Sequence, residues 1–218
     1  MSVLQRLASA QGRRDDVPNQ ELARELAAAR DHDTIRELVA HLHDPDRKIQ
    51  SDCIKTLYEI GYLAPELVAP YAEDFLALLR SRNNRLVWGG MIALLTIAPL
   101  RASFLFEHRE EIQQAIAKGS VITVDRGIRA LAAVAAQDDA YRAVLLPYLL
   151  EHLRTCRPKD LSGRAEAVLP AVDAAHRDAF LAILAARLPD LRPAQTRRLQ
   201  KVIAAAQDLK TERGKSDA

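Results

Sequence analysis

The sequence Ile-Lys-Thr-Leu-Tyr-Glu-Ile at residues 54–60 carries an apolar pattern that recurs along the chain. Its five copies begin 37 residues apart, with a last step of 34, at Ile54, Met91, Ile128, Ala165 and Leu199. We call these five residues anchors and align the copies on them. Four further sets of equivalent positions, or columns, lie 16 and 12 residues before and 3 and 6 residues after each anchor. Nineteen of these 20 positions are apolar, where the 49% apolar composition of the chain gives about ten. The exception is Arg187. The chain is therefore predicted to consist largely of five internal repeats.

Each repeat is predicted to hold two helices, because apolar offsets of 3, 4 and 7 residues mark one face of a helix. The first helices are expected at 33–43, 66–80, 103–117, 139–155 and 176–188. The second helices are expected at 46–61, 84–98, 121–136, 159–174 and 193–207. A further helix at 19–29 precedes the first repeat, and residues 1–17 are predicted to form an amphipathic helix followed by a charged turn.

Turn signals separate the two helices of each repeat. The expected N-caps of second helices are Asp46, Asn84 and Ser120. The prolines suited to a first helical turn are Pro158 and Pro193. Three further prolines fall inside predicted helices and are expected to kink them: Pro70, Pro147 and Pro170.

Composition agrees with an all-α protein. The chain has 218 residues, of which 37 are Ala and 31 are Leu, whereas only 8 Gly and 10 Pro interrupt helices. Its two cysteines are far too few for a disulfide scaffold. The predicted organisation is an N-terminal arm and capping helix (1–32), a single repeat domain (33–207) and a mobile tail (208–218). Without a secretory signal or a long apolar run, the expected location is the cytoplasm.

The repeat resembles the HEAT/armadillo class of helical-repeat proteins and is closer to HEAT. The resemblance is carried by the two-helix units, the apolar columns, and the Asp44-Pro45 turn with Arg47-Lys48 after it. It covers residues 33–207 and implies a right-handed α-solenoid of about five repeats, with the second helices lining a concave surface. The turns of repeats two and four lack the charged residues of this pattern, and the fifth repeat is three residues short.

Catalytic patterns are missing from the sequence. It holds no Gly-rich phosphate loop, no His-Glu-x-x-His, no Cys-x-x-Cys and no Gly-x-Ser-x-Gly, so a non-enzyme without cofactor or metal is predicted. Two loose metal arrangements are weaker alternatives. His41 and His43 stand beside acids at a turn, and His152 lies one helical turn before Cys156 without a third ligand nearby.

The outer face of the second helices is the candidate binding surface. Positions 6 and 2 before each anchor and 1 after it point away from the predicted core and carry seven basic and two acidic residues. The candidate partner-binding residues are these seven and the only tryptophan: Lys48, Lys55, Arg85, Trp88, Arg126, Arg129, Lys159 and Arg197. The plainer alternatives are that the cations only solubilise the protein and that Trp88 is partly buried.

The favoured function is a non-catalytic scaffold that binds a protein segment, acidic in character, on the concave face. The alternative is a nucleic-acid-binding protein, because the chain also resembles the HEAT-like DNA-alkylation-repair glycosylases in size, repeat type and basic face. Trp88, Asp125 and the pair Arg126 and Arg129 would then fill the aromatic, acidic and basic roles of that family. Single-stranded nucleic-acid binders usually need more stacking side chains than the chain supplies.

Overall fold

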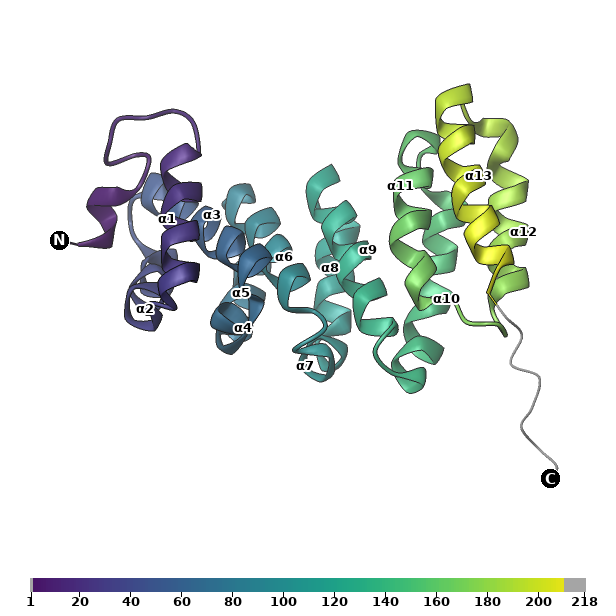
Figure 1. The fold of residues 1–218 in the computed structure, drawn as a ribbon, viewed down its shortest axis with the longest axis horizontal. Helices are drawn as coiled ribbons and strands as arrows, with labels where there is room; N and C mark the ends of the chain where they lie inside the picture. The colour runs from purple at the N-terminus through teal and green to yellow at the C-terminus, as the bar shows by residue number, and fades with distance from the viewer. Residues whose placement is uncertain (1, 210–218) are drawn as a thin grey trace. The chain divides into compact units, whose positions relative to one another are not determined.

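The structure is a computed structural model that describes residues 2–209. Those residues fold into helices joined by short turns, with no β-strand among them, as the all-α prediction requires (Figure 1). The chain divides into two compact units, residues 1–130 and 131–218. The predictions of one repeat domain, five repeats and a right-handed twist stay predictions.

The first unit holds the first three predicted repeats. Before them come the 3-10 helix η1 (Val3–Arg6) and α1 (Val17–Ala29). Repeat one consists of α2 (His32–Ala40), η2 (His41–His43) and α3 (Arg47–Leu63). Repeat two consists of α4 (Pro65–Val68), η3 (Ala69–Tyr71), α5 (Ala72–Ala77), η4 (Leu78–Arg80) and α6 (Asn84–Ile97). Repeat three consists of α7 (Ala102–Glu107), α8 (Arg109–Lys118) and α9 (Val121–Ala135), whose last residues belong to the second unit.

Second helices pack against one another in the first unit, with α3 between α1 and α6 (Figure 1). In repeats one and two the first helix packs on the second helix of its own repeat, as α2 does on α3 and α5 on α6. The anchors and their apolar columns form the core, and Ile54, Met91 and Ile128 are all at most 1% exposed. Burial of these columns supplies most of the stabilisation of such a helix pair.

Glycines set how closely these helices approach. A Cβ on Gly90 would lie 2.8 Å from the carbonyl oxygen of Phe75, and one on Gly127 would lie 2.5 Å from Ile116. Both glycines immediately precede an anchor, so the close contact is between the two helices of one repeat. Small residues at the position before the anchor therefore serve helix packing.

The second unit contains α10 (Asp139–Thr155), α11 (Pro158–Val168), η5 (Leu169–Ala171), α12 (Arg177–Arg187), η6 (Leu188–Asp190) and α13 (Pro193–Gln207). Here α10 packs on α12, and α11 packs on α13. Arg187, the exception in the apolar columns, donates from its guanidinium to the carbonyl oxygens of Leu153 and Cys156, at 2.8 Å each. It thereby satisfies carbonyl groups left open at the end of α10.

Most predicted caps are confirmed. The Asp46 carboxylate accepts from the Lys48 amide at 2.7 Å, and the Ser120 hydroxyl accepts from the Thr123 amide at 3.3 Å. Pro158 and Pro193 are the first residues of their helices. The prediction of Asn84 as a cap is wrong by one residue, because Asn83 accepts from the Arg85 amide at 3.1 Å.

Two of the three internal prolines interrupt their helices as predicted. Pro70 lies in η3 and Pro170 in η5, where the regular hydrogen bonding is broken. Pro147 does not end α10, which runs continuously past it. The predicted helix 103–117 is instead divided at His108 without any proline.

The N-terminal segment differs from its prediction. Only Val3–Arg6 is helical before α1, as a short 3-10 helix, and the chain then continues through turns that include Gly12 at φ +68°. Val3, Leu7 and Ala8 are nevertheless buried, so the segment closes the end of the first unit. Of the predicted tail 208–218, only Asp208 and Leu209 lie within the described residues.

Candidate functional site

A groove of about 740 Å³, here called the N-terminal groove, lies between residues 8–16 and the first turns of α3 and α6. Its lining residues come from these three segments: Ala8, Ser9, Gly12, Arg13, Arg14, Asp15, Asp16, Arg47, Lys48, Ser51, Asp52, Asn83, Asn84 and Arg85. Lys48 and Arg85, two of the predicted partner-binding residues, therefore line one site.

The groove carries a net positive charge. Five cations face three carboxylates around it, a surplus of two. Arg13 pairs with Asp15 at 3.0 Å. No ion pair within residues 2–209 engages the other four, which are Arg14, Arg47, Lys48 and Arg85. All four are exposed, so their charges are available to a ligand.

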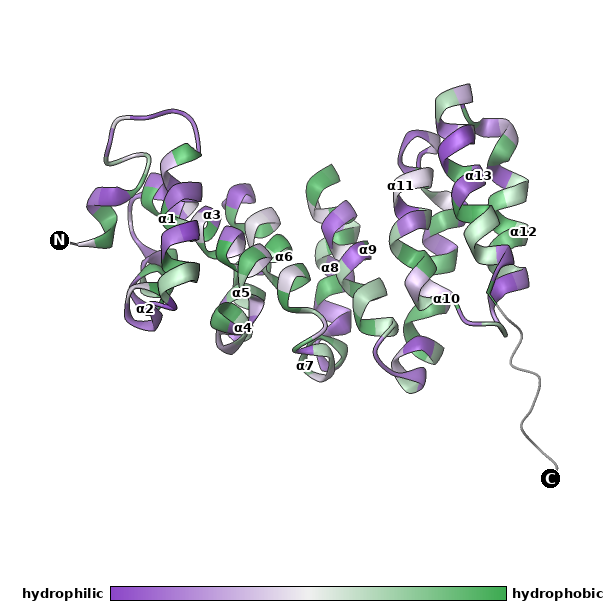
Figure 2. Cartoon of the chain, viewed as in Figure 1, coloured by the Kyte–Doolittle hydropathy of each residue, from purple (hydrophilic) through white to green (hydrophobic). Residues whose placement is uncertain are grey.

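Asp52 holds the wall of the groove in place instead of facing a ligand. Its carboxylate accepts from the Ser9 amide at 2.8 Å and from the Asn19 side-chain nitrogen at 2.9 Å. Asn19 is fully buried, and its own oxygen accepts from the Ala8 amide at 2.9 Å. These bonds tie the segment before α1 to α3, so residues 8–16 form a defined wall, largely hydrophilic in Figure 2.

Asp15 is engaged within the same segment. It accepts from the Val17 amide at 3.1 Å and pairs with Arg13. The pKa of Asp15 is lowered, first by the hydrogen bond from the Val17 backbone and then by Arg13. The carboxylate therefore stays ionised and bound to its neighbours.

Lys55 lies two turns after Lys48 on α3 and already forms an ion pair with Glu59. Its ammonium donates to Glu59 at 2.6 Å, lies 3.7 Å from Asp16 and stands 4.9 Å from the centre of the Tyr58 ring. Burial lowers the pKa of Lys55, but the hydrogen bonds to Glu59 and Tyr58 outweigh it and raise the pKa to about 12. Lys55 thus offers a ligand little free charge.

Trp88 is half-buried on α6, and its ring centre lies 6.3 Å from that of Tyr58 on α3. The neighbouring Gly89 does not open space for a ligand. A Cβ there would lie 2.8 Å from Ile54, so Gly89 lets α6 approach α3. The partial burial of Trp88 agrees with the plainer of the two sequence interpretations.

Arg126 and Arg129 share one acid on α9. The nearest nitrogen–oxygen distances to Asp125 are 3.7 Å for Arg126 and 3.0 Å for Arg129. The acid and the two bases that the glycosylase alternative needs are therefore bound to one another.

The column one residue after each anchor, which includes Lys55 and Arg129, was predicted to point away from the core. Its member on α6, Ile92, is only 6% exposed, so this column does not point fully away from the core.

Lys159 and Arg197, the last two predicted partner-binding residues, belong to the second unit. They lie near the starts of α11 and α13 and are exposed, with no ion pair among the described residues. Glu166 on α11 forms an ion pair with Arg198 on α13.

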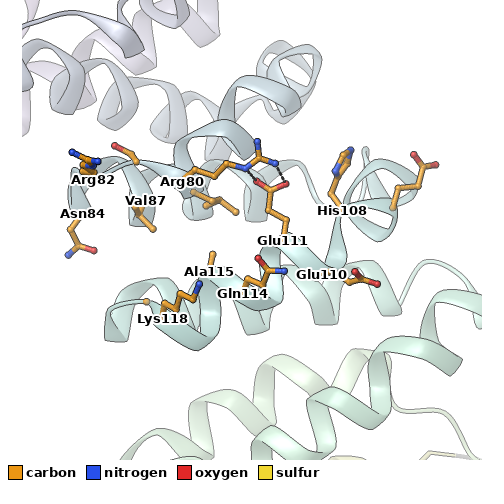
Figure 3. A pocket seen from close by; sticks show the side chains of 14 residues that line it. Arg80, Arg82, Asn84, Val87, His108, Glu110, Glu111, Gln114, Ala115 and Lys118 are labelled. Carbon is orange, nitrogen blue, oxygen red and sulfur yellow. Dashed lines mark hydrogen bonds and ion pairs between the residues drawn. The ribbon is translucent and has the colours of Figure 1, made fainter.

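A second hollow in the first unit, here called the central groove, has nearly the same size, about 730 Å³ (Figure 3). It lies between η4, the start of α6, and α8. Its three cations are Arg80, Arg82 and Lys118, and its three carboxylates are Glu107, Glu110 and Glu111. Arg80 faces Glu111 across the hollow with a nitrogen–oxygen distance of 2.7 Å. The central groove is balanced in charge.

Sequence reasoning missed three of the cations in the N-terminal groove. Arg13 and Arg14 stand in the segment before α1, outside the repeat, and Arg47 directly precedes Lys48. The doublets Arg13-Arg14 and Arg47-Lys48 were the available signal. The predicted binding surface was drawn from selected positions of each second helix relative to its anchor. Neighbouring basic residues outside those positions were therefore overlooked.

No group of three His, Cys, Asp or Glu side chains within residues 2–209 is placed to hold a metal ion. His152 contacts the buried guanidinium of Arg164 at 2.6 Å, and burial together with that cation lowers the pKa of His152 to about 4. Burial raises the pKa of the Cys156 thiol.

Among the described residues, no helix combines the length and apolarity that crossing a membrane requires.

Comparisons with known proteins identify the fold. No family model and no curated protein sequence matches the chain. Among solved structures, a designed armadillo repeat protein in complex with the peptide (KR)4 matches with a TM-score of 0.67 and 15% identity, covering 89% of this chain and 90% of that one. An engineered protein matches with a TM-score of 0.63 and 18% identity, over 94% of this chain and 98% of that one.

The karyopherin Kap121p, bound to the extreme C-terminus of the protein phosphatase Cdc14p, matches with a TM-score of 0.58 and 15% identity. That match covers 87% of this chain but 21% of the karyopherin. None of the three is described as an enzyme. Together with the two-helix repeats, these matches show that the chain has a HEAT/armadillo-type helical-repeat fold.

Proposed function

We propose that the protein is a non-catalytic interaction scaffold whose first unit binds an extended acidic segment of a partner protein. The segment enters at the N-terminal groove and continues along the face of α3, α6 and α9, which we take as the concave side because the family resemblance implies it. The observation that carries this proposal is the set of four exposed cations, Arg14, Arg47, Lys48 and Arg85, around one groove without an ion pair among the described residues.

Similar structures support a peptide as the class of ligand. One bears the peptide (KR)4 and another bears the C-terminus of a phosphatase. A repeat fold does not fix the charge of its ligand, because that is set by side chains on the binding face. Here the groove is basic, so the complementary segment carries aspartate and glutamate.

The side chains beyond the groove also suit a peptide. The half-buried Trp88 and the exposed Tyr62 flank Tyr58 along α3 and α6 and offer apolar surface next to polar atoms. Such amphipathic rings commonly anchor bound segments. No specific observation favours nucleic acid over a protein segment, since the lining of the N-terminal groove contains no aromatic residue.

The test is fluorescence anisotropy with three labelled peptides of equal length: an alternating Glu-Asp octamer, a Lys-Arg octamer and an uncharged Ser-Gln octamer. The Glu-Asp peptide is expected to bind at least tenfold more tightly than the other two. The double variant Lys48→Gln/Arg85→Gln should weaken it, whereas Arg24→Gln/Lys201→Gln, which removes the same charge elsewhere, should not. Equal binding of all three peptides would contradict the proposal, and circular dichroism checks that each variant is folded.

A further inference from the structure

The N-terminal groove gathers its free cations from three separate segments. Arg14 lies on the wall before α1, Arg47 and Lys48 begin α3, and Arg85 lies in the first turn of α6. The wall is held by Asp52, so Arg14 is kept on the same groove as the others. Cations that three segments contribute to one groove suit a ligand with several acceptor oxygens.

Among the described residues, the carboxylates of the groove form no ion pair with these four cations. Asp52 is bound to Ser9 and Asn19, and Asp15 is bound to Arg13 and the Val17 amide. Asp16 lies toward Lys55 at 3.7 Å. Each acid has a partner within the first unit, which leaves the four free cations to an added anion.

The number and kind of these cations distinguish between anions. One arginine fork satisfies one carboxylate, whereas a phosphomonoester carries nearly two charges at neutral pH and presents three acceptor oxygens. Three of the four free cations are arginines. The cluster therefore exceeds what an isolated glutamate or aspartate needs and matches a dianionic phosphate.

The rest of the lining narrows the source of the phosphate. Among the residues that line the groove, Ala8 is the only one with an apolar side chain, and none is aromatic. Acyl chains and unstacked bases would find no apolar contact or stacking surface there. A phosphorylated side chain of a protein segment needs neither.

We propose that the N-terminal groove binds a phosphorylated residue, phosphoserine or phosphothreonine, within the partner segment. This inference rests on the proposed function, because it assigns the phosphate to the same bound segment. Phosphorylation of the partner would then switch its affinity for this scaffold.

The experiment uses the full chain and three labelled nonapeptides with identical neutral flanks and serine, glutamate or phosphoserine at the centre. At pH 7.5 the phosphoserine peptide is expected to bind at least tenfold more tightly than the glutamate peptide. Arg47→Gln/Arg85→Gln should remove that advantage, and the matched control Arg24→Gln/Lys201→Gln should keep it within twofold. Circular dichroism confirms folding of both variants.

A pH comparison tests the charge on the phosphate. Its second pKa is about 6, so at pH 5 it carries close to one charge and the advantage over glutamate should fall several-fold. The groove itself contains no histidine, and its charged groups are the five cations and Asp15, Asp16 and Asp52. Glutamate and phosphoserine peptides of equal affinity at pH 7.5 would overturn the inference.

The two proposals fail separately in this design. Binding of the Glu-Asp octamer without any phosphoserine advantage leaves the scaffold function standing and refutes the phosphate site. Failure of both the octamer and the phosphoserine peptide refutes both. Tighter binding of single-stranded DNA than of the phosphoserine peptide, lost in Arg47→Gln/Arg85→Gln, would assign the groove to nucleic acid and overturn the inference.

Discussion

Two grooves of nearly equal volume, about 740 and 730 Å³, lie in the same unit, yet they differ in charge. The central groove balances three cations with three carboxylates, and its Arg80 is paired with Glu111. The N-terminal groove has an excess of two cations, which comes from Arg47, Lys48 and Arg85 against Asp52 at the starts of α3 and α6. Two hollows of similar size in one unit therefore differ in net charge.

The strongest test of this difference is charge reversal in each groove. Arg47→Glu/Arg85→Glu should weaken binding of the Glu-Asp octamer roughly 30-fold, since each reversed exposed charge costs about 1 kcal/mol. The matched change in the central groove, Arg82→Glu/Lys118→Glu, should alter affinity by less than about threefold. Anisotropy titrations measure both, and equal losses would mean that the two grooves are not different sites.

Removal of an acid should also change the free energy of unfolding by different amounts in the two grooves. Asp52→Ala leaves the buried side-chain nitrogen of Asn19 without its acceptor and is expected to lower the free energy of unfolding by about 1–3 kcal/mol. Glu111→Gln removes the charge that faces the mostly exposed Arg80 and should cost about 0–1 kcal/mol. Urea denaturation followed by circular dichroism compares them, and an equal cost would show that Asp52 does not fix the wall.

Ionic strength gives a third test, because the cations of the N-terminal groove are exposed. Raising the salt from about 50 to 300 mM should weaken binding of the Glu-Asp octamer about tenfold, as screening shortens the reach of exposed charges. In Arg47→Gln/Arg85→Gln the same change of salt should have a clearly smaller effect. A salt-independent affinity would mean that apolar contacts, rather than these charges, hold the peptide.

The smallest expected effect is a gain of binding in the central groove. Glu107→Gln/Glu110→Gln gives that groove the same excess of two cations as the N-terminal groove. In the background of Arg47→Gln/Arg85→Gln, it should restore affinity for the octamer by about two- to threefold. An unchanged affinity in this background would show that excess charge alone does not create the site.

The sequence predicted the helices well because their apolar columns are buried through local contacts. The predicted spans 139–155 and 193–207 coincide with α10 and α13, and Pro70 and Pro170 break their helices as expected. The division at His108 was not predicted, since no proline or glycine marks it. The N-terminal segment was predicted as a helix, whereas the structure holds it by hydrogen bonds to Asn19 on α1 and Asp52 on α3.

The candidate site could be predicted only in part. Lys48 and Arg85 follow from helical periodicity, and the structure does bring them to one groove. The pairing of charges does not follow, because partners such as Asp16 and Lys55 lie 3.7 Å apart in space but far apart in the sequence. Which cations are free therefore depends on tertiary structure.

The most direct test of the central claim is mapping of the Glu-Asp octamer on the isotope-labelled chain by amide chemical shifts. At saturating peptide, the largest shifts are expected at residues 8–16, 47–52 and 83–85, which surround the N-terminal groove. Residues 107–119 of the central groove should change little. Shifts confined to 107–119, or no shifts at 47–52 and 83–85 at saturation, would contradict the account.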